Sequence, residues 1–156
     1  MSKVIKLKEL IISIAIPLLV GGLSSLFSMN GFKEFEAIKK PSFTPPGILF
    51  PIVWTILYVL MGIGSYLVYN SNCKNKIKAF RVYSLSLFFN FLWSILFFSF
   101  KLYWFSFIWL VVLWILIAVT IYRFYGCNKT AGFLQIPYFL WVSFAGVLNA
   151  FVAVLN

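Results

Sequence analysis

Residues 103–124 read YWFSFIWLVVLWILIAVTIYRF and contain a single charged residue, Arg123. A helix needs about 20 predominantly apolar residues to cross the hydrocarbon core of a bilayer. This stretch is long enough and apolar enough to do so. It therefore predicts a membrane-spanning helix, and we interpret the rest of the chain outward from it.

Apolar stretches of similar length occur on both sides of residues 103–124. Short polar connectors separate them, and no stretch repeats the pattern of another. We therefore expect one domain over residues 1–156, an all-α integral membrane bundle of five transmembrane helices. The predicted spans are residues 9–29, 46–69, 79–100, 103–124 and 131–154.

The composition agrees with a membrane protein. Of the 156 residues, 63% are apolar and 10% are charged, whereas a soluble domain is roughly 45–50% apolar and about 25% charged. These proportions exclude a soluble globular enzyme, a disordered chain and a secreted disulfide scaffold.

The basic residues lie between the apolar stretches rather than on one amphipathic face. The chain carries 13 Lys and Arg against 3 acidic residues, a formal charge of +10. Because the charges flank the spans, we expect them to contact anionic membrane lipid, and we expect no nucleic-acid partner.

The distribution of Lys and Arg predicts the orientation. Nine of them fall in the N-terminal segment and around the connectors after the second and fourth spans, and four fall on the opposite side. The positive-inside rule then places the N-terminus in the cytoplasm and the C-terminus outside. Cys73 and Cys127 fall near the cytoplasmic side, where thiols stay reduced. We therefore expect two free thiols.

The residue types needed for most catalytic and metal sites are missing. The chain has no His and no Asp, so it can build neither a Ser-His-Asp triad nor a histidine metal site. No ionisable acid or base lies deep in a predicted span, which argues against a proton relay or a voltage sensor. We expect no metal site, no required cofactor and no dedicated acid/base pair.

Aromatic and amide side chains recur at helical spacing on three of the spans. Steps of three and four residues place them on one face of each helix. Such faces fit a cavity for a flat, mostly apolar ligand. They also fit buried amides that hold helices together, worth about 0.6–2 kcal/mol each, and the spacing leaves both interpretations open. The residues are Trp54 and Tyr58; Asn90, Trp93 and Phe97; and Tyr138, Trp141, Ala145, Leu148 and Asn149.

Three segments carry motifs that lie in order along the chain. They are KPSFTPPG at 40–47 with PIVWTILY at 51–58, FNFLWS at 89–94, and PYFLWVSFA at 137–145 followed by Leu148-Asn149. Together they resemble the translocator protein (TspO/MBR) family, also called the tryptophan-rich sensory protein or peripheral benzodiazepine receptor family.

The resemblance implies a five-helix bundle, usually a homodimer, with a ligand cavity beneath the loop that joins the first two helices. Family members are implicated in binding porphyrins, and some bacterial ones promote light-dependent porphyrin degradation. Mammalian relatives bind cholesterol and synthetic isoquinoline or benzodiazepine ligands. By motif, Trp54 and Trp141 match the pocket tryptophans. Other cavity positions match Asn90, Trp93, Ala145, Leu148 and Asn149.

Two departures from the family pattern bear on function. The family's usual Trp in the loop segment is Phe43 here. The tail after Asn149 contains no Tyr followed by Lys or Arg, which the proposed cholesterol motif requires. The second departure argues against steroid transport.

We therefore expect a membrane receptor for porphyrins, with protoporphyrin IX as the ligand. The porphyrin would stack on Trp54, Trp93 and Trp141, while Asn90 and Asn149 would bond its polar edges. If light-dependent breakdown occurs, Trp54 and Trp141 would serve as electron donors or quenchers rather than as acid and base.

The loop between the first two spans is expected to cover this ligand. Its lysines would contact the propionates, and Phe43 would supply an aromatic contact. The loop residues in question are Lys33, Lys39, Lys40 and Phe43.

Two other functions stay open at this point. One is transport of a small lipophilic molecule, such as a tetrapyrrole or a lipid, along the bundle. The other is a regulatory membrane protein whose aromatic faces only pack helices together and bind no saturable ligand. The composition favours a bacterial plasma membrane, and the mitochondrial outer membrane is the alternative.

Overall fold

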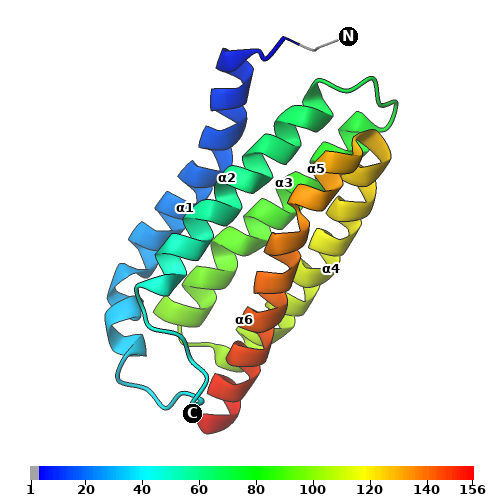
Figure 1. The fold of residues 1–156 in the computed structure, drawn as a ribbon. Coiled ribbons are helices and arrows are strands. Elements are labelled where there is room, and N and C mark those ends of the chain that lie inside the picture. Colours follow the sequence, from blue (N-terminus) through cyan, green and yellow to red (C-terminus); the bar gives the residue numbers. More distant parts are fainter. Residues whose placement is uncertain (1–3) are drawn as a thin grey trace.

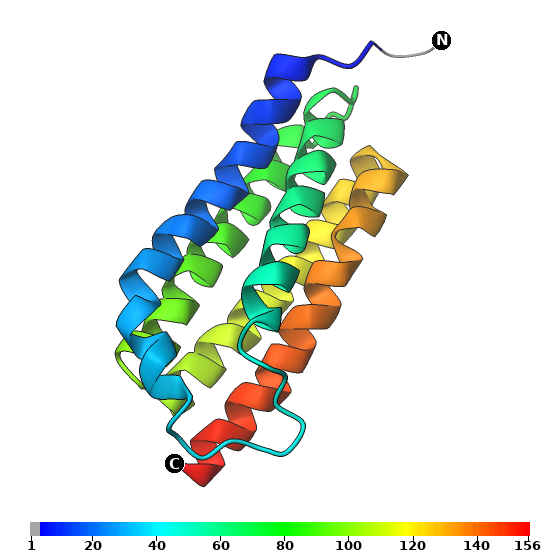
Figure 2. The ribbon, with the colours of Figure 1, turned by 60° about the vertical axis from the view of Figure 1, so that its left-hand side comes forward.

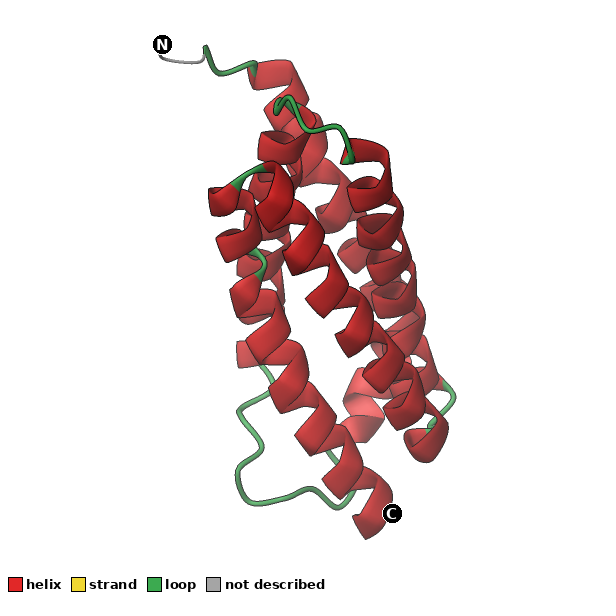
Figure 3. Cartoon of the chain, turned by 90° about the vertical axis from the view of Figure 1, so that its right-hand side faces the viewer, coloured by secondary structure: helices red, strands yellow, loops and turns green. Residues whose placement is uncertain are grey.

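The computed structural model describes residues 4–156, and every regular element in that range is helical (Figure 3). Five long helical segments run side by side along the molecule (Figure 1), and each is long and apolar enough to cross a membrane. The predicted class, an all-α membrane bundle of five helices, is confirmed. The elements are α1 (Leu7–Phe35), α2 (Leu49–Tyr69), α3 (Lys76–Ser94), the π-helical turn η1 (Ile95–Ser99), α4 (Tyr103–Cys127), α5 (Lys129–Leu134) and α6 (Ile136–Leu155).

Several helices extend beyond the apolar stretches that predicted them. α1 continues through the polar residues 30–35, because Lys and Glu are good helix formers whatever their hydropathy. The third segment joins α3 to η1, and the fifth joins α5 to α6 across Gln135. Asn128 begins the fifth segment, since its side chain accepts a 3.0 Å hydrogen bond from the Ala131 amide.

Glycines allow α1 to approach its neighbours closely. A Cβ atom on Gly62 of α2 would lie 2.5 Å from the Ile14 Cα of α1, and a Cβ on Gly31 of α1 would lie 2.2 Å from the Phe98 carbonyl oxygen of η1. Any larger side chain at either position would collide with backbone. These two crossings therefore set the position of α1 on the bundle.

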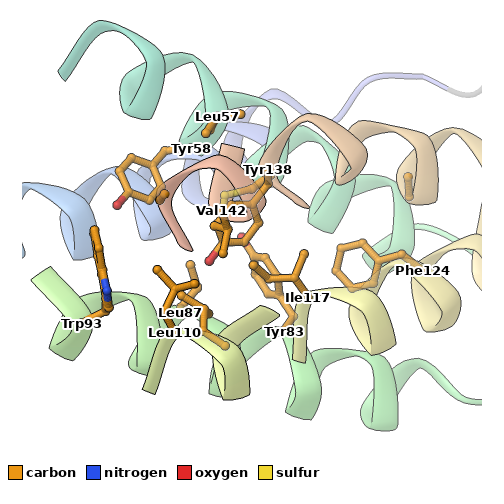
Figure 4. Packing of buried hydrophobic residues seen from close by; sticks show 14 of the residues in the cluster. Leu57, Tyr58, Tyr83, Leu87, Trp93, Leu110, Ile117, Phe124, Tyr138 and Val142 are labelled. Carbon is orange, nitrogen blue, oxygen red and sulfur yellow. The ribbon is translucent and has the colours of Figure 1, made fainter. Parts of the chain in front are cut away.

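The core runs along the bundle axis between α2, α3, α4 and α6. Figure 4 shows Tyr58, Leu87, Leu110 and Val142, one from each of these helices, pointing toward one another. The large apolar side chains on the outer faces of α1 and α4 are exposed instead. This inverted arrangement is the one expected of a bundle whose outer surface faces lipid.

The two ends of the bundle collect different segments. The described N-terminus, the α2–α3 connector and the α4–α5 junction lie at one end, and the α1–α2 loop and the C-terminus lie at the other (Figure 1). The expectation of two free thiols is wrong, because Cys73 and Cys127 form a disulfide at the first end. Both cysteines were expected near one face. The fold then brings their Cα atoms to 4.9 Å, within bonding range.

Candidate ligand site beneath the α1–α2 loop

A cavity lies between the α1–α2 loop and the ends of the two helices that this loop joins. We call residues 36–48 the lid, since they connect α1 to α2 (Figure 2) and many of them line the cavity. The cavity volume is about 550 Å³, within the range typical of small-molecule sites. Its lining residues are Phe35, Glu36, Ile38, Lys40, Pro41, Thr44, Pro45, Pro46, Gly47 and Phe50.

Two phenylalanines connect this cavity to the aromatic interior. Phe35, in the last turn of α1, lies 5.7 Å from the Phe97 ring. Phe50, in the first turn of α2, lies edge-on to the Trp141 ring at 5.8 Å. The cavity floor is therefore continuous with the side chains that the helical spacing grouped together.

Trp54, Tyr58 and Tyr138 form one aromatic group below Phe50. The Trp54 and Tyr58 rings are stacked, with centroids 5.5 Å apart, and the Tyr138 ring meets Trp54 edge-on at 6.2 Å. Asn90 Nδ2 donates a 3.3 Å hydrogen bond to the Tyr58 hydroxyl. Trp54 is half-buried, whereas Tyr138 is fully buried. Of this group, Trp54 is the member most open to a ligand.

Asn149 is the centre of a second group. Its Oδ1 accepts hydrogen bonds from Trp93 Nε1 at 3.0 Å and from Ser106 Oγ at 3.2 Å, and its Nδ2 donates to the Tyr103 carbonyl at 2.9 Å. The Phe97 ring stacks on Trp93 at 5.4 Å. These bonds join α3, α4 and α6 and use three of the four hydrogen bonds that the Asn149 amide can make. Ala145 and Leu148 are also buried in this region.

Trp141 and Tyr138 each carry a buried polar atom without a hydrogen-bond partner among the described residues, and Trp141 is the less buried of the two. Trp141 is half-buried, its ring touches Phe50 and Phe144, and its buried Nε1 has no hydrogen-bond partner within residues 4–156. An unpaired buried donor costs about 1–3 kcal/mol. Trp141 does not itself line the cavity, but its ring adjoins Phe50, which does, and its indole N–H has a hydrogen bond still to make.

The predicted lid residues hold four different positions. Lys40 lines the cavity, and its Nζ donates a 3.1 Å hydrogen bond to the Glu36 carbonyl while lying 4.9 Å from the Phe35 ring centroid. Phe43 packs on α6 instead, 5.3 Å from the Phe151 ring. Lys39 is tied through its backbone to Asn156. Lys33, in the last turn of α1, is not among the lining residues.

An ion pair lies beside the site, outside the apolar core. Lys101, in the turn before α4, pairs with Glu34 near the end of α1. The Glu34 carboxylate hydrogen-bonds the Lys101 ammonium and attracts its charge, and both effects raise the pKa of that group. The pair links the lid end of α1 to the start of α4. Elsewhere in residues 4–156, no group of three His, Cys, Asp or Glu side chains gathers in a way that could hold a metal ion.

Helical spacing did not find the walls of the cavity. Phe35, Glu36 and Phe50 lie at helix ends, where a periodic face has too few turns to be recognised. The lid contributes Pro41, Thr44, Pro45, Pro46 and Gly47. A signal for them was present in the proline-rich segment, which carried part of the family resemblance.

The TspO/MBR family matches residues 13–155 of the chain. The chain belongs to this family. It is 34% identical to the tryptophan-rich protein TspO of Archaeoglobus fulgidus, over 95% of this chain and 97% of that protein. It is 31% identical to protein CrtK of Rhodobacter capsulatus, over 87% and 85%. It is 28% identical to the translocator protein of Bos taurus, over 86% and 82%. The family resemblance inferred from three motifs is thus confirmed across nearly the whole chain.

Proposed function

We propose that this TspO/MBR protein is a membrane receptor that binds a porphyrin, or a similar flat hydrophobic ligand, beneath its lid. The observation that carries the proposal is the cavity of about 550 Å³ whose floor, Phe35 and Phe50, leads to Trp141. A flat apolar ring fits walls of this kind, because aromatic stacking adds about 0.5–1.5 kcal/mol per contact to the burial of apolar area.

The proposed ligand contacts are side chains that are partly exposed or that lack a hydrogen-bond partner among the described residues. Trp54 and Trp141 are half-buried, and the unpaired Trp141 Nε1 can donate to a polar edge of the ligand. Lys40 is the cation of the cavity wall and would contact a carboxylate. Asn149 and Trp93, which are hydrogen-bonded to each other, would hold the contacting side chains in place.

The proposed chemistry, if the bound porphyrin is broken down in light, is electron donation or quenching by Trp54 and Trp141. Electron transfer from an indole to the light-excited porphyrin would give an indole radical cation and a porphyrin radical anion, and dissolved dioxygen would be the oxidant that breaks the ring. Trp54 stacks on Tyr58, so a tyrosine adjoins one of the two tryptophans.

A fluorescence titration with protoporphyrin IX in darkness tests the binding. We expect saturable quenching in the micromolar range for the wild type and weaker binding for Trp141→Phe. Trp114→Phe is the matched control, because Trp114 stacks on Phe139 and donates to Ser143 Oγ away from the cavity. Linear, unsaturable quenching would mean partition into micelles and would contradict the proposal.

Illumination of the same samples tests the chemistry separately. We expect a light-dependent change in the porphyrin spectrum that slows when Trp54 and Trp141 are both replaced by Phe, with much of the binding retained. Equal loss of binding and of breakdown would contradict a redox role for these tryptophans.

We further propose that the protein lies in a bacterial plasma membrane as a homodimer, surrounded by lipid, with its disulfide end in the cytoplasm. The count of Lys and Arg supports this orientation, whereas the disulfide favours an oxidising compartment. Labelling of a cysteine introduced at Lys39, in a chain without Cys73 and Cys127, decides between them. An impermeant maleimide added to intact cells should label Lys39→Cys. Protection of this site from the maleimide would show the opposite orientation.

A further inference from the structure

One polar side chain, that of Asn156 directly after α6, ties the lid to the end of this helix. Asn156 Oδ1 accepts a hydrogen bond from the Lys39 amide at 3.3 Å, and Asn156 Nδ2 donates to the Lys39 carbonyl at 2.8 Å. One amide thus satisfies both polar backbone groups of a single lid residue. Lys39 lies between Ile38 and Lys40, which both line the cavity. Its position therefore determines where the cavity wall stands.

A second contact holds the same segment against the same helix. The Phe43 ring lies edge-on to Phe151 at 5.3 Å and to Phe144 at 6.2 Å. Phe144 in turn touches Trp141, with ring centroids 5.3 Å apart. Phe43 is nevertheless exposed, and hydrogen bonds inside the lid, such as Thr44 to the Pro41 carbonyl, do not reach α6. Asn156 is therefore the polar attachment of the lid to α6.

We infer that Asn156 is a positioning residue of the ligand site: it latches the lid closed through the Lys39 backbone, and release of this latch controls entry and exit of the ligand. The inference rests on the proposed function for its ligand. The latch itself is a property of the free protein. Figure 2 shows the lid passing beside the C-terminal end of α6, where the latch lies.

Hydrogen exchange of the ligand-free protein in nanodiscs tests the latch. With Asn156→Ala, the lid amides, and that of Lys39 above all, should exchange about tenfold faster, because two hydrogen bonds are lost. Asn156→Asp keeps the acceptor but loses the donor, so it should give a smaller increase. The rest of the bundle should exchange as in the wild type.

Asn70→Ala is the matched control. Asn70 follows α2 at the opposite end of the bundle and donates to the Tyr66 carbonyl four residues earlier, as Asn156 donates to the Val152 carbonyl. Both variants lose a hydrogen bond at the end of a helix, but only Asn156→Ala also loses the hydrogen bonds to the lid. Lid exchange that does not rise in Asn156→Ala, or rises equally in Asn70→Ala, would overturn the latch.

Stopped-flow binding of protoporphyrin IX tests the consequence. In Asn156→Ala both the association and the dissociation rate constants should rise about tenfold while the dissociation constant changes much less, since a gate alters rates more than affinity. Faster lid exchange with unchanged rate constants would overturn the gating role. If the wild type binds no porphyrin saturably, the proposed function fails, and the exchange experiment still decides the latch.

Discussion

At the scale of single residues, Asn149 shows how a polar group can serve the helices rather than the ligand. It is fully buried and makes three hydrogen bonds that reach α3 and α4. Both lone pairs of its oxygen and one of its two Nδ2 hydrogens are thus engaged by the protein, and one hydrogen remains for another acceptor. The three bonds support the interhelical interpretation for Asn149, while the Trp141 indole N–H makes no hydrogen bond within residues 4–156.

Replacing Asn149 tests this division of roles. Asn149→Leu should lower the free energy of unfolding by about 1–3 kcal/mol, because the buried Trp93 indole N–H loses its acceptor. The Tyr103 carbonyl, by contrast, keeps Ser106 Oγ as a donor. Thermal unfolding in detergent measures the effect. The double variant with Trp93→Phe should lose less than the sum of the single losses. Normal stability with lost porphyrin binding would show instead that Asn149 serves the ligand.

Lys101 combines backbone strain with an ion pair. Its φ of 54° lies in the left-handed region, which disfavours residues with a Cβ, and its ammonium pairs with Glu34. Lys101→Gly and Lys101→Ala both lose the pair, but only Gly also relieves the strain. We therefore expect the Gly variant to unfold a few degrees higher than the Ala variant. Equal unfolding midpoints for the Gly and Ala variants would contradict backbone strain at Lys101.

The ion pair also gives a pH dependence with a definite sign. Glu34 raises the pKa of Lys101 above its ordinary value of 10.5. A raised pKa means that the pair contributes fully at neutral pH and loses its effect as the pH rises through the raised value. As the pH rises from neutrality, the difference between wild type and Lys101→Gly should accordingly stay constant until strongly alkaline solution, and it should shrink at high salt.

At the scale of elements, the π-helical turn η1 places two adjacent aromatic rings against α1. Phe97 and Phe98 both contact Phe35, with ring centroids 5.7 and 5.3 Å away. A π-helical turn inserts an extra residue and so rotates the face that follows it. The cavity wall at Phe35 therefore depends on how closely α1 approaches η1, which Gly31 allows.

Gly31→Ala tests this dependence. Its Cβ would collide with the Phe98 carbonyl oxygen at 2.2 Å, so α1 must move away, at a cost of about 1–3 kcal/mol, and porphyrin binding should weaken with it. Gly22→Ala on the same helix is the matched control, since a Cβ there meets nothing within 4 Å. It should be neutral or slightly stabilising. Equal effects of the two changes on the unfolding midpoint would contradict this account of α1.

At the scale of the whole molecule, the disulfide closes the bundle at the end opposite the lid. Cys73 and Cys127 are 54 residues apart in sequence, and a loop of this size is worth about 2–4 kcal/mol when cross-linked. We expect reductant to lower the unfolding midpoint of the wild type but not of the Cys73→Ser/Cys127→Ser variant. Ready labelling of both thiols without reductant would contradict the bond.

Sequence reasoning succeeded where the signal was continuous along one segment. Residues 103–124 predict a spanning helix because the bilayer demands apolar length, and the helix Tyr103–Cys127 agrees. The spacing of Trp54 and Tyr58 likewise predicts that they share one face of α2, and in the structure their rings are stacked. Helix ends were less certain, since Lys and Glu extend α1 to Phe35 beyond its apolar stretch.

Hydropathy and motifs by themselves determined that the chain is a five-helix membrane bundle of the TspO/MBR family, because span length and local motifs are written in consecutive residues. Only the tertiary structure decided which side chains the buried amides bond, that Cys73 meets Cys127, and that Asn156 holds Lys39. Each of these joins residues far apart in the chain. Which partner a side chain meets depends on how the helices pack, and the spacing within one helix carries no record of that.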